Sequence, residues 1–371
     1  YRAAPFWAWN CELDKAELLR QIEVLKEMGF GGFHMHSRSG MATNYLSEEF
    51  MDLVTACCDK AEAEDMLAYL YDEDRWPSGF AGGIVTKDKR FRHRHLQITV
   101  NPIKEAVADF NDAYNNGEPY YLTEFNVLLN KNGELSSYSV TKDEPKEDET
   151  KWYAYIVIEN ESGWYNNQTY VDTLSKKAID RFIEVTHEAY KKAVGDRFGK
   201  TVPSIFTDEP QFWHKQTLAF AQSKDDVTLP WTMELEKKFS EHYGYDICDK
   251  LPELFWDLPE GKISYARYCY HDFVTELFTQ SFADNCGKWC KDNGIAFTGH
   301  MLNEPTLFTQ TGSLGEAMRA YRSFTIPGID MLCDGHEYTT AKQAQSAAHQ
   351  YGREGVMSEL YGVTGWDFDF R

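Results

Sequence analysis

Short apolar runs alternate with longer amphipathic stretches along most of the chain. The runs have the length of β-strands and are expected as strands at residues 5–10, 32–36, 66–71, 202–206, 295–298, 328–332 and 355–357. The longer stretches carry apolar residues at helical spacing, and Asp14 and Ser47 precede two of them as N-caps. Strands that alternate with helices in this way predict a parallel sheet flanked by helices.

The alternation stops in the middle of the chain, where β signals dominate. Residues 95–100 alternate in polarity, and the turn sequence at 130–133 separates two β-rich runs as in a hairpin. We therefore predict a first part of a barrel at 1–89, a small antiparallel β insertion at 90–170 after the third strand, and a second part of the barrel at 171–371.

The spacing of the strands and helices predicts an α/β fold of the (β/α)8 TIM-like barrel type, incomplete at its eighth strand. A doubly wound open sheet is the alternative. It requires a glycine-rich phosphate loop after the first strand, whereas this strand runs into Trp7-Ala8-Trp9-Asn10. The chain reaches Arg371 without a clear eighth strand, so we expect either a degenerate strand or a piece of a longer enzyme.

Composition narrows the possible partners. The chain has 371 residues with 38 basic and 59 acidic side chains, and its formal net charge is −21. Nucleic acid and anionic membranes carry the same sign of charge, so neither is expected as a partner. A neutral carbohydrate is not repelled. The aromatic share of 15% offers flat faces for sugar rings, although the same side chains also fill a large core.

The eight cysteines and the N-terminus bear on localisation. No Cys-x-x-Cys pair occurs, so a structural zinc site is not expected, and the scattered cysteines are typical of reduced thiols. No apolar stretch has the ~18 residues of a membrane span. We favour a cytoplasmic protein. A secreted or periplasmic one is the alternative if a leader precedes Tyr1.

In a barrel, functional side chains follow the C-terminal ends of the strands, where the loops converge. Every predicted strand ends in polar or aromatic groups. In strand order, these are Trp7, Trp9 and Asn10; His34, His36 and Arg38; Asp72, Glu73, Asp74 and Trp76; Asp208 and Glu209; His300 and Glu304; Asp334, His336 and Glu337; and Glu359 with Trp366. One such acid alone is equally well explained as a helix N-cap. The whole set is not, because gathered like charges cost free energy.

Glycoside hydrolysis needs two carboxyl groups beside the scissile bond, one of which must stay protonated. Crowded carboxylates raise each other's pKa and so supply that protonated group. We assign Glu209 as the general acid, because it follows an apolar strand and precedes Pro210. Glu359 is the first candidate for its partner, Glu304 the second and Glu337 the third, because Glu337 could equally hold a substrate hydroxyl. The remaining strand-end side chains are expected to bind the substrate.

Two other functions remain open. Alternation places His34 and His36 on one side of their strand, and metal-dependent hydrolases use such pairs as ligands. With His300, His336 and an acid they would hold zinc or a similar ion, but we favour binding of sugar hydroxyls, since no lysine at a strand end bridges two metals. A non-catalytic sugar-binding barrel is the third hypothesis, and the number of acids argues against it.

Several segments resemble the α-L-rhamnosidase-like glycoside hydrolases of family 106. They are residues 5–10 (PFWAWN), 31–36 (GGFHMH), 71–79 (YDEDRWPSG), 206–210 (FTDEP), 298–300 (TGH), 327–330 (PGID) and 346–350 (SAAHQ), which leads to Ser358 and Glu359. The resemblance keeps its order over nearly the whole chain.

The resemblance implies a barrel catalytic domain, with β domains downstream in a longer chain. It also implies a carbohydrate substrate, an inverting mechanism with glutamates as acid and base, and calcium near the sugar. No organic cofactor is expected. By motif, Glu209 matches the acid after the fourth strand and Glu359 an acid after the seventh, whereas Glu304 matches less cleanly.

Overall fold

The main element of the fold is a curled sheet of parallel strands. The computed structural model describes residues 2–332 and 338–365. Within them, seven strands follow the order β1-β2-β3-β8-β10-β11-β12, and all neighbours are parallel. They are β1 (Phe6–Trp9), β2 (Gly32–Ser37), β3 (Leu67–Tyr71), β8 (Ser204–Asp208), β10 (Ala296–His300), β11 (Ile326–Met331) and β12 (Met357–Leu360). Each overlaps a strand predicted from the sequence.

The curled sheet is part of a barrel with two open edges. β1 lies at one edge and β12 at the other, and within the described ranges no strand joins them. The β/α alternation that predicted a barrel is therefore confirmed as a partial barrel. A complete eight-stranded barrel stays a prediction.

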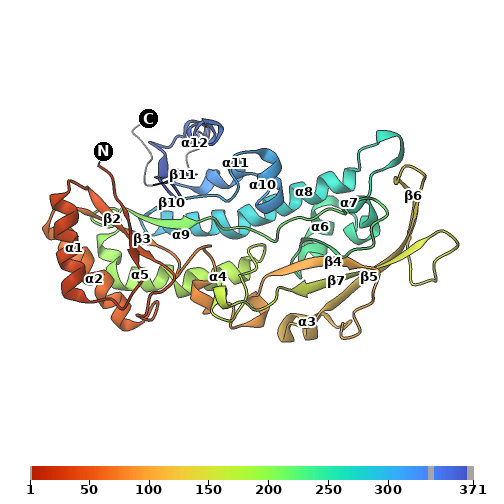
Figure 1. Ribbon diagram of the computed structural model, residues 1–371, viewed down its shortest axis with the longest axis horizontal. Helices are drawn as coiled ribbons and strands as arrows, with labels where there is room; N and C mark the ends of the chain where they lie inside the picture. Colours follow the sequence, from red (N-terminus) through yellow and green to blue (C-terminus); the bar gives the residue numbers. More distant parts are fainter. Residues whose placement is uncertain (1, 333–337, 366–371) are drawn as a thin grey trace.

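Helices cover the outer face of the curled sheet. The α-helices are α1 (Lys15–Glu27), α2 (Glu48–Ala63), α3 (Phe110–Asn116), α4 (Lys176–Val185), α5 (His187–Val194), α6 (Leu235–Tyr243), α7 (Pro252–Phe255), α8 (Tyr265–Phe278), α9 (Asn285–Asp292), α10 (Leu307–Ser313), α11 (Ala317–Ala320) and α12 (Tyr338–Gln350). The predicted N-caps are present: Asp14 accepts the N–H of Glu17 at 2.8 Å, and Ser47 accepts that of Phe50 at 3.2 Å. α1, α2 and α5 lie together at one end of the molecule (Figure 1).

A separate antiparallel sheet lies at the other end of the molecule (Figure 1). Its order is β6-β5-β7-β4-β9. The strands are β4 (Arg94–Thr99), β5 (Tyr120–Leu129), β6 (Leu135–Val140), β7 (Thr150–Ile158) and β9 (Val227–Pro230). The first four lie in the predicted insertion, and a turn at 130–133 joins β5 to β6 as predicted. β9 was not predicted; it comes from beyond residue 170 and pairs with β4.

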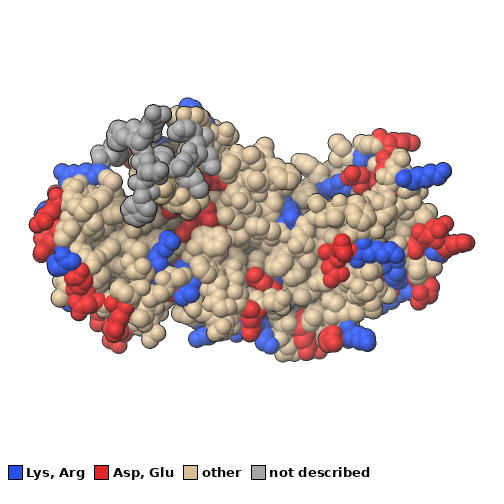
Figure 2. Space-filling model, viewed as in Figure 1, with Lys and Arg blue, Asp and Glu red and all other residues tan. Residues whose placement is uncertain are grey.

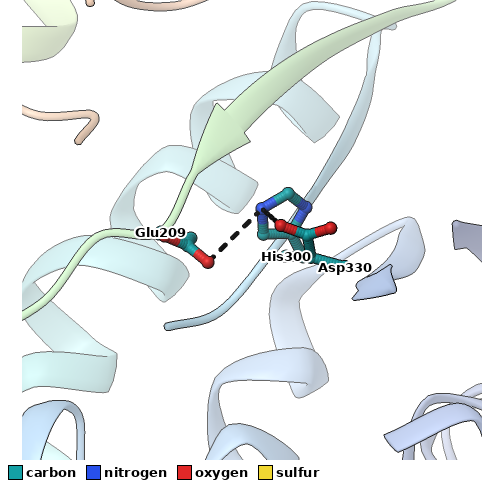
Figure 3. Close-up of side chains that lie close together, drawn as sticks. All are labelled: Glu209, His300 and Asp330. Carbon is teal, nitrogen blue, oxygen red and sulfur yellow. Dashed lines mark ion pairs between the residues drawn. The ribbon is translucent and has the colours of Figure 1, made fainter. Parts of the chain in front are cut away.

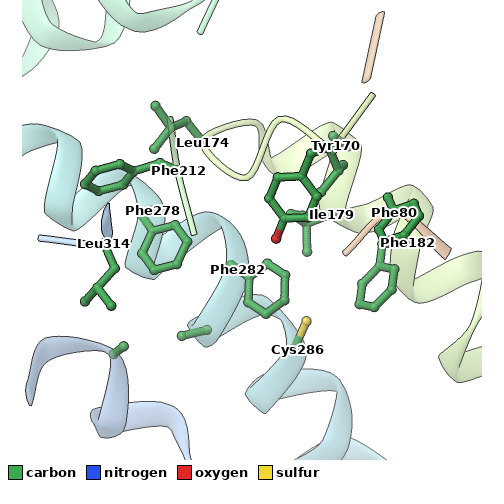
Figure 4. Close-up of a cluster of buried hydrophobic side chains, with 14 of the residues drawn as sticks. Phe80, Tyr170, Leu174, Ile179, Phe182, Phe212, Phe278, Phe282, Cys286 and Leu314 are labelled. Carbon is green, nitrogen blue, oxygen red and sulfur yellow. The ribbon is translucent and has the colours of Figure 1, made fainter. Parts of the chain in front are cut away.

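One long helical run links the two sheets. α8, the π-helical segment η7 (Thr279–Asp284) and α9 follow one another without a break and extend from the antiparallel sheet to the curled sheet (Figure 1). Phe278 and Phe282 of this run pack with Phe182 of α4 and with Phe212, which follows the fourth predicted strand (Figure 4). The segment after β8 is thereby anchored in the core between the sheets.

Two further observations concern membrane-spanning helices and the state of the cysteines. No helix within the described residues is long and apolar enough to cross a membrane. All seven cysteines in that part of the chain are free, and six of them are buried.

Candidate active site

Parallel strands bring their last inward-facing side chains to one rim. Paired residues of neighbouring strands point to the same face, and the pairs His300 with Asp208 and Asp330 with Glu359 stand near the C-terminal ends of their strands. Figure 2 shows acidic side chains over both ends of one face of the molecule and a further group in a recess nearer its middle. As a result of the register, four carboxylates surround one imidazole.

The imidazole of His300 is the centre of this group and is 1% exposed. Its Nε2 lies 3.2 Å from Asp208 Oδ1 and 3.8 Å from both Glu209 Oε1 and Asp330 Oδ2. Its Nδ1 lies 3.8 Å from Glu359 Oε2. Figure 3 shows Glu209 and Asp330 converging on the ring. Glu209 and Glu359 thus contact opposite nitrogens of one ring.

Asp208 and His300 form a charged pair. Burial opposes the ionisation of Asp208, but the hydrogen bond and charge of His300 hold its pKa below the usual value. Burial also disfavours the imidazolium, yet Asp208 and Glu209 raise the pKa of His300 well above the usual value. Tyr71 donates its hydroxyl proton to Asp208 Oδ2 at 2.8 Å. The site therefore holds one fixed cation among several acids.

Glu209 and Glu359 hold protons more tightly than ordinary carboxyl groups. Burial raises the pKa of Glu209 to about 7 and that of Glu359 to about 8. The charge of Glu209 also raises the pKa of Glu359, so the loss of the proton on Glu209 changes the affinity of Glu359 for its own. We infer that the pair carries about one proton near neutral pH, which is the state that acid–base catalysis requires.

The backbone and one indole fix the orientation of Glu209. Its φ angle is 45°, in the left-handed region that residues other than glycine rarely adopt. Such strained backbone clusters at functional sites. The indole Nε1–H of Trp76 donates to Glu209 Oε2 at 2.6 Å. Because Oε2 already accepts the indole N–H, Oε1, the oxygen that faces His300, is better placed to carry a proton.

Glu304 lies beside this group but is held by other contacts. It is 4% exposed, its Oε2 accepts the backbone N–H of Asp330 at 3.0 Å, and its Oε1 accepts the hydroxyl of Tyr321 at 2.9 Å. Burial raises the pKa of Glu304 to about 7. With both oxygens engaged, Glu304 is better placed to position Asp330 than to reach a substrate.

The three acidic side chains that follow β3 form hydrogen bonds and an ion pair within their own loop. Glu73 is fully buried, and its two oxygens accept five backbone N–H groups, from Asp74 and from residues 79–82. Asp72 accepts the hydroxyl of Ser78 at 2.5 Å, and Asp74 pairs with Arg75 at 2.6 Å. These bonds hold the loop that presents Trp76 to Glu209.

His34 and His36 lie inside the curled sheet, deeper than the carboxylates. His34 stacks on Tyr69 with ring centroids 4.5 Å apart, and His36 lies between Phe6 at 4.6 Å and Tyr71 at 4.0 Å. Burial lowers the pKa of His34 to about 3 and that of His36 to about 4, so both rings are neutral near pH 7. They form the aromatic floor beneath the charged rim.

The first strand presents its tryptophans to the helices instead of the rim. Trp7 donates its indole N–H to Gln21 of α1 at 2.7 Å, and Trp9 is 1% exposed and packs against Phe50 of α2. Both were predicted to bind substrate, and alternation along β1 turns them to the outer face. Asn10 and Arg38 are exposed at the ends of β1 and β2. Asp334, His336, Glu337 and Trp366 lie outside the described residues.

Three side chains of this region were missed in the sequence. The sequence indicates Asp330 only as part of the motif at residues 327–330, although it alternates with Gly328 on the inward face of β11. Tyr71, which binds Asp208, was read only as part of an apolar run. Trp164, whose indole lies 6.5 Å from that of Trp76, belongs to the predicted insertion and carries no local signal.

One group in the described residues has the spacing of a metal site: Glu209, His300 and Asp330 offer ligand atoms within 4.8 Å of one another. The implied calcium does not fit this set, because Ca²⁺ takes six to eight oxygen ligands and an imidazolium that donates to Asp208 has no free electron pair at Nε2. His34 and His36 do not belong to this group.

Comparisons with known proteins agree with the fold. No protein-family model and no curated protein matches the sequence. Among solved structures, the structure of a rhamnosidase from Novosphingobium sp. PP1Y is similar, with a TM-score of 0.65 at 13% sequence identity. The match covers 99% of this chain and 53% of that chain, so this chain spans about half the length of the structure it matches. At this identity the likeness shows a shared fold.

Proposed function

We propose that this chain carries the active site of a glycoside hydrolase. The observation that carries the proposal is the set of four carboxylates around His300, with Glu209 and Glu359 on opposite ring nitrogens. A sugar-binding protein has no need of two acids that retain protons near neutral pH. The shared fold with a rhamnosidase supports the same function.

In the proposed reaction, Glu209 acts as the general acid. Its Oε1–H protonates the glycosidic oxygen as the bond from that oxygen to the anomeric carbon breaks. Glu359, in the molecules in which it is ionised, accepts a proton from a water molecule, whose oxygen forms the new bond to the anomeric carbon. By the family resemblance the mechanism would be inverting, with the water on the face of the sugar opposite the acid. The ion pair of Asp208 and His300 keeps one negative and one positive charge beside these two carboxyl groups.

A neutral sugar is the proposed substrate, and an α-L-rhamnoside is the first class to test. The acidic rim and the net charge of −21 favour a neutral ligand over an anionic one. Asn10 and Arg38 remain candidates for binding its hydroxyl groups. Calcium near the sugar and β domains downstream remain proposals from the family resemblance.

The test is the variant Glu209→Gln with aryl α-L-rhamnosides and a panel of other aryl glycosides. We expect kcat to fall by about 10²- to 10⁴-fold, the usual contribution of a general acid, while substrate binding persists. Glu12→Gln, at an exposed position, is the matched control and should keep the wild-type rate. A wild-type rate in Glu209→Gln would contradict the assignment. Binding without turnover by the wild-type protein across the panel would favour a sugar-binding barrel.

A further inference from the structure

Two exposed indoles from distant parts of the chain meet beside Glu209. Trp76 is 38% exposed and Trp164 is 45% exposed, whereas Trp9, Trp152 and Trp231 are almost fully buried. Trp164 lies in the short helical turn η3 (Gly163–Tyr165) that follows β7. The two ring centroids are 6.5 Å apart and the planes are inclined by 65°. Exposed tryptophans at a site rim offer apolar faces that suit a pyranose ring.

Hydrogen bonds hold both indoles in place while both side chains stay partly exposed. Trp164 donates its Nε1–H to the carbonyl oxygen of Trp76 at 2.8 Å, across 88 residues of sequence. Trp76 in turn donates to Glu209 Oε2 at 2.6 Å. The backbone N–H of Trp164 is bound by the hydroxyl of Ser162 at 3.2 Å. A surface ordered in this way loses little entropy when a ligand binds.

A polar cavity is lined in part by residues of the two segments that carry the indoles. It has a volume of about 320 Å³, and its lining includes Thr43, Asn44, Asp74, Arg75 and Asn166. Arg75 directly precedes Trp76, and Asn166 follows Trp164 by two residues and donates to the carbonyl oxygen of Gly82 at 2.9 Å. The size is at the lower end of the roughly 300–1,000 Å³ of small-molecule pockets. Amide, hydroxyl and paired charged groups suit a neutral ligand rich in hydroxyls.

This inference rests on the proposed role of Glu209 as the general acid. In that case the two indoles and the cavity lie on the leaving-group side of the substrate. A general acid must lie within hydrogen-bond reach of the leaving oxygen, so the leaving group lies next to the carboxyl that Trp76 holds. We infer that Trp164, with Trp76, stacks on the first sugar ring of an oligosaccharide leaving group. The cavity lined by Asn44, Arg75 and Asn166 takes the hydroxyl groups of that ring. The antiparallel region would thus supply specificity to the site on the curled sheet.

The test compares two substrates that differ in the leaving group. An α-L-rhamnosyl disaccharide has a sugar leaving group that reaches Trp164, and α-L-rhamnosyl fluoride has one that does not. In Trp164→Ala, kcat/KM for the disaccharide should fall about tenfold, the effect of one lost aromatic contact, and that for the fluoride should stay unchanged. Trp164→Phe keeps a stacking face and should retain most of the disaccharide activity. Tyr268→Ala, 62% exposed on α8, is the control.

A binding measurement separates this inference from the proposed function. Calorimetric titration of the disaccharide into Glu209→Gln, with and without Trp164→Ala, should show about tenfold weaker binding in the double variant. Equal binding, or an equal loss of rate on both substrates, would overturn the stacking role. If the wild-type protein hydrolyses neither substrate but Trp164→Ala still weakens binding, the subsite stands and the hydrolase proposal fails.

Discussion

The two sheets of this molecule differ in what their strand ends can do. Parallel strands bring all their C-terminal ends to one rim, so a polar residue at each end contributes to one cluster. In an antiparallel sheet neighbouring ends point in opposite directions, and such a cluster cannot form. The curled sheet accordingly gathers Asp208, His300, Asp330 and Glu359, whereas β5 and β7 bury Phe125, Trp152 and Ile156 for packing.

The charged groups and the groups that would select a substrate come from different regions of the molecule. The charged groups come from the sheet whose geometry forces them together. The antiparallel region places Trp164 beside Trp76 through a turn after β7. Substitutions in the two regions should therefore separate loss of activity from loss of stability.

The largest expected effect is that of His300→Gln in the curled sheet. Glutamine removes the imidazolium that lies among four carboxylates, so Asp208 loses its charged partner and the proton on the Glu209–Glu359 pair is redistributed. We expect kcat/KM to fall by about 10²- to 10⁴-fold, as for loss of a group that controls proton transfer. His349→Gln, at an exposed position of α12, is the control in the same steady-state assay. Activity that survives in His300→Gln would show that the cluster does not depend on its central cation.

A substitution in the core of the antiparallel sheet should lower stability and leave the activity of the folded protein unchanged. Trp152 is 2% exposed and its ring lies 5.4 Å from that of Trp256. In Trp152→Ala, we expect the free energy of unfolding to fall by about 3–5 kcal/mol, through lost burial and a cavity. Urea unfolding measures this loss, and kcat/KM of the folded protein should be unchanged. Phe220→Ala, at a side chain that is 61% exposed, should change neither quantity. A specific loss of kcat in Trp152→Ala would contradict the separation of the two regions.

The sequence allowed much of the curled sheet to be predicted, because its signals are local. A buried strand shows as an apolar run, and the helices between strands show their caps, as Asp14 and Ser47 do. Strand ends were therefore located to within a few residues, and Asp208, Glu209, His300 and Glu359 were found as residues that follow them. β9 was missed because four residues before a long helical region give too weak a signal.

Side-chain direction was harder to predict than position along the chain. Trp7 and Trp9 alternate with Phe6 and Ala8, and only the partners across the sheet decide which pair faces inward. Glu73 stands at a strand end like Glu209, yet five backbone N–H groups bind it within its own loop. Trp164 depends on a contact across 88 residues, which no local pattern encodes.

The smallest effect expected within the curled sheet is a change in how stability depends on pH in Glu359→Gln. Burial raises the pKa of Glu359 from 4.5 to about 8, so between these pH values the folded state binds a proton that the unfolded state does not. The stability that this proton contributes is fully present below about pH 4 and is lost as the pH rises through 8. Glutamine cannot titrate, so between pH 5 and pH 9 the wild-type protein should lose about 2–4 kcal/mol more than Glu359→Gln. Urea unfolding at both pH values measures the difference, with Glu12→Gln expected to follow the wild type. Equal pH dependence in the wild type and Glu359→Gln would mean that Glu359 is ionised in the folded protein, and the proton held at the rim of the curled sheet would then have to be assigned to Glu209 alone.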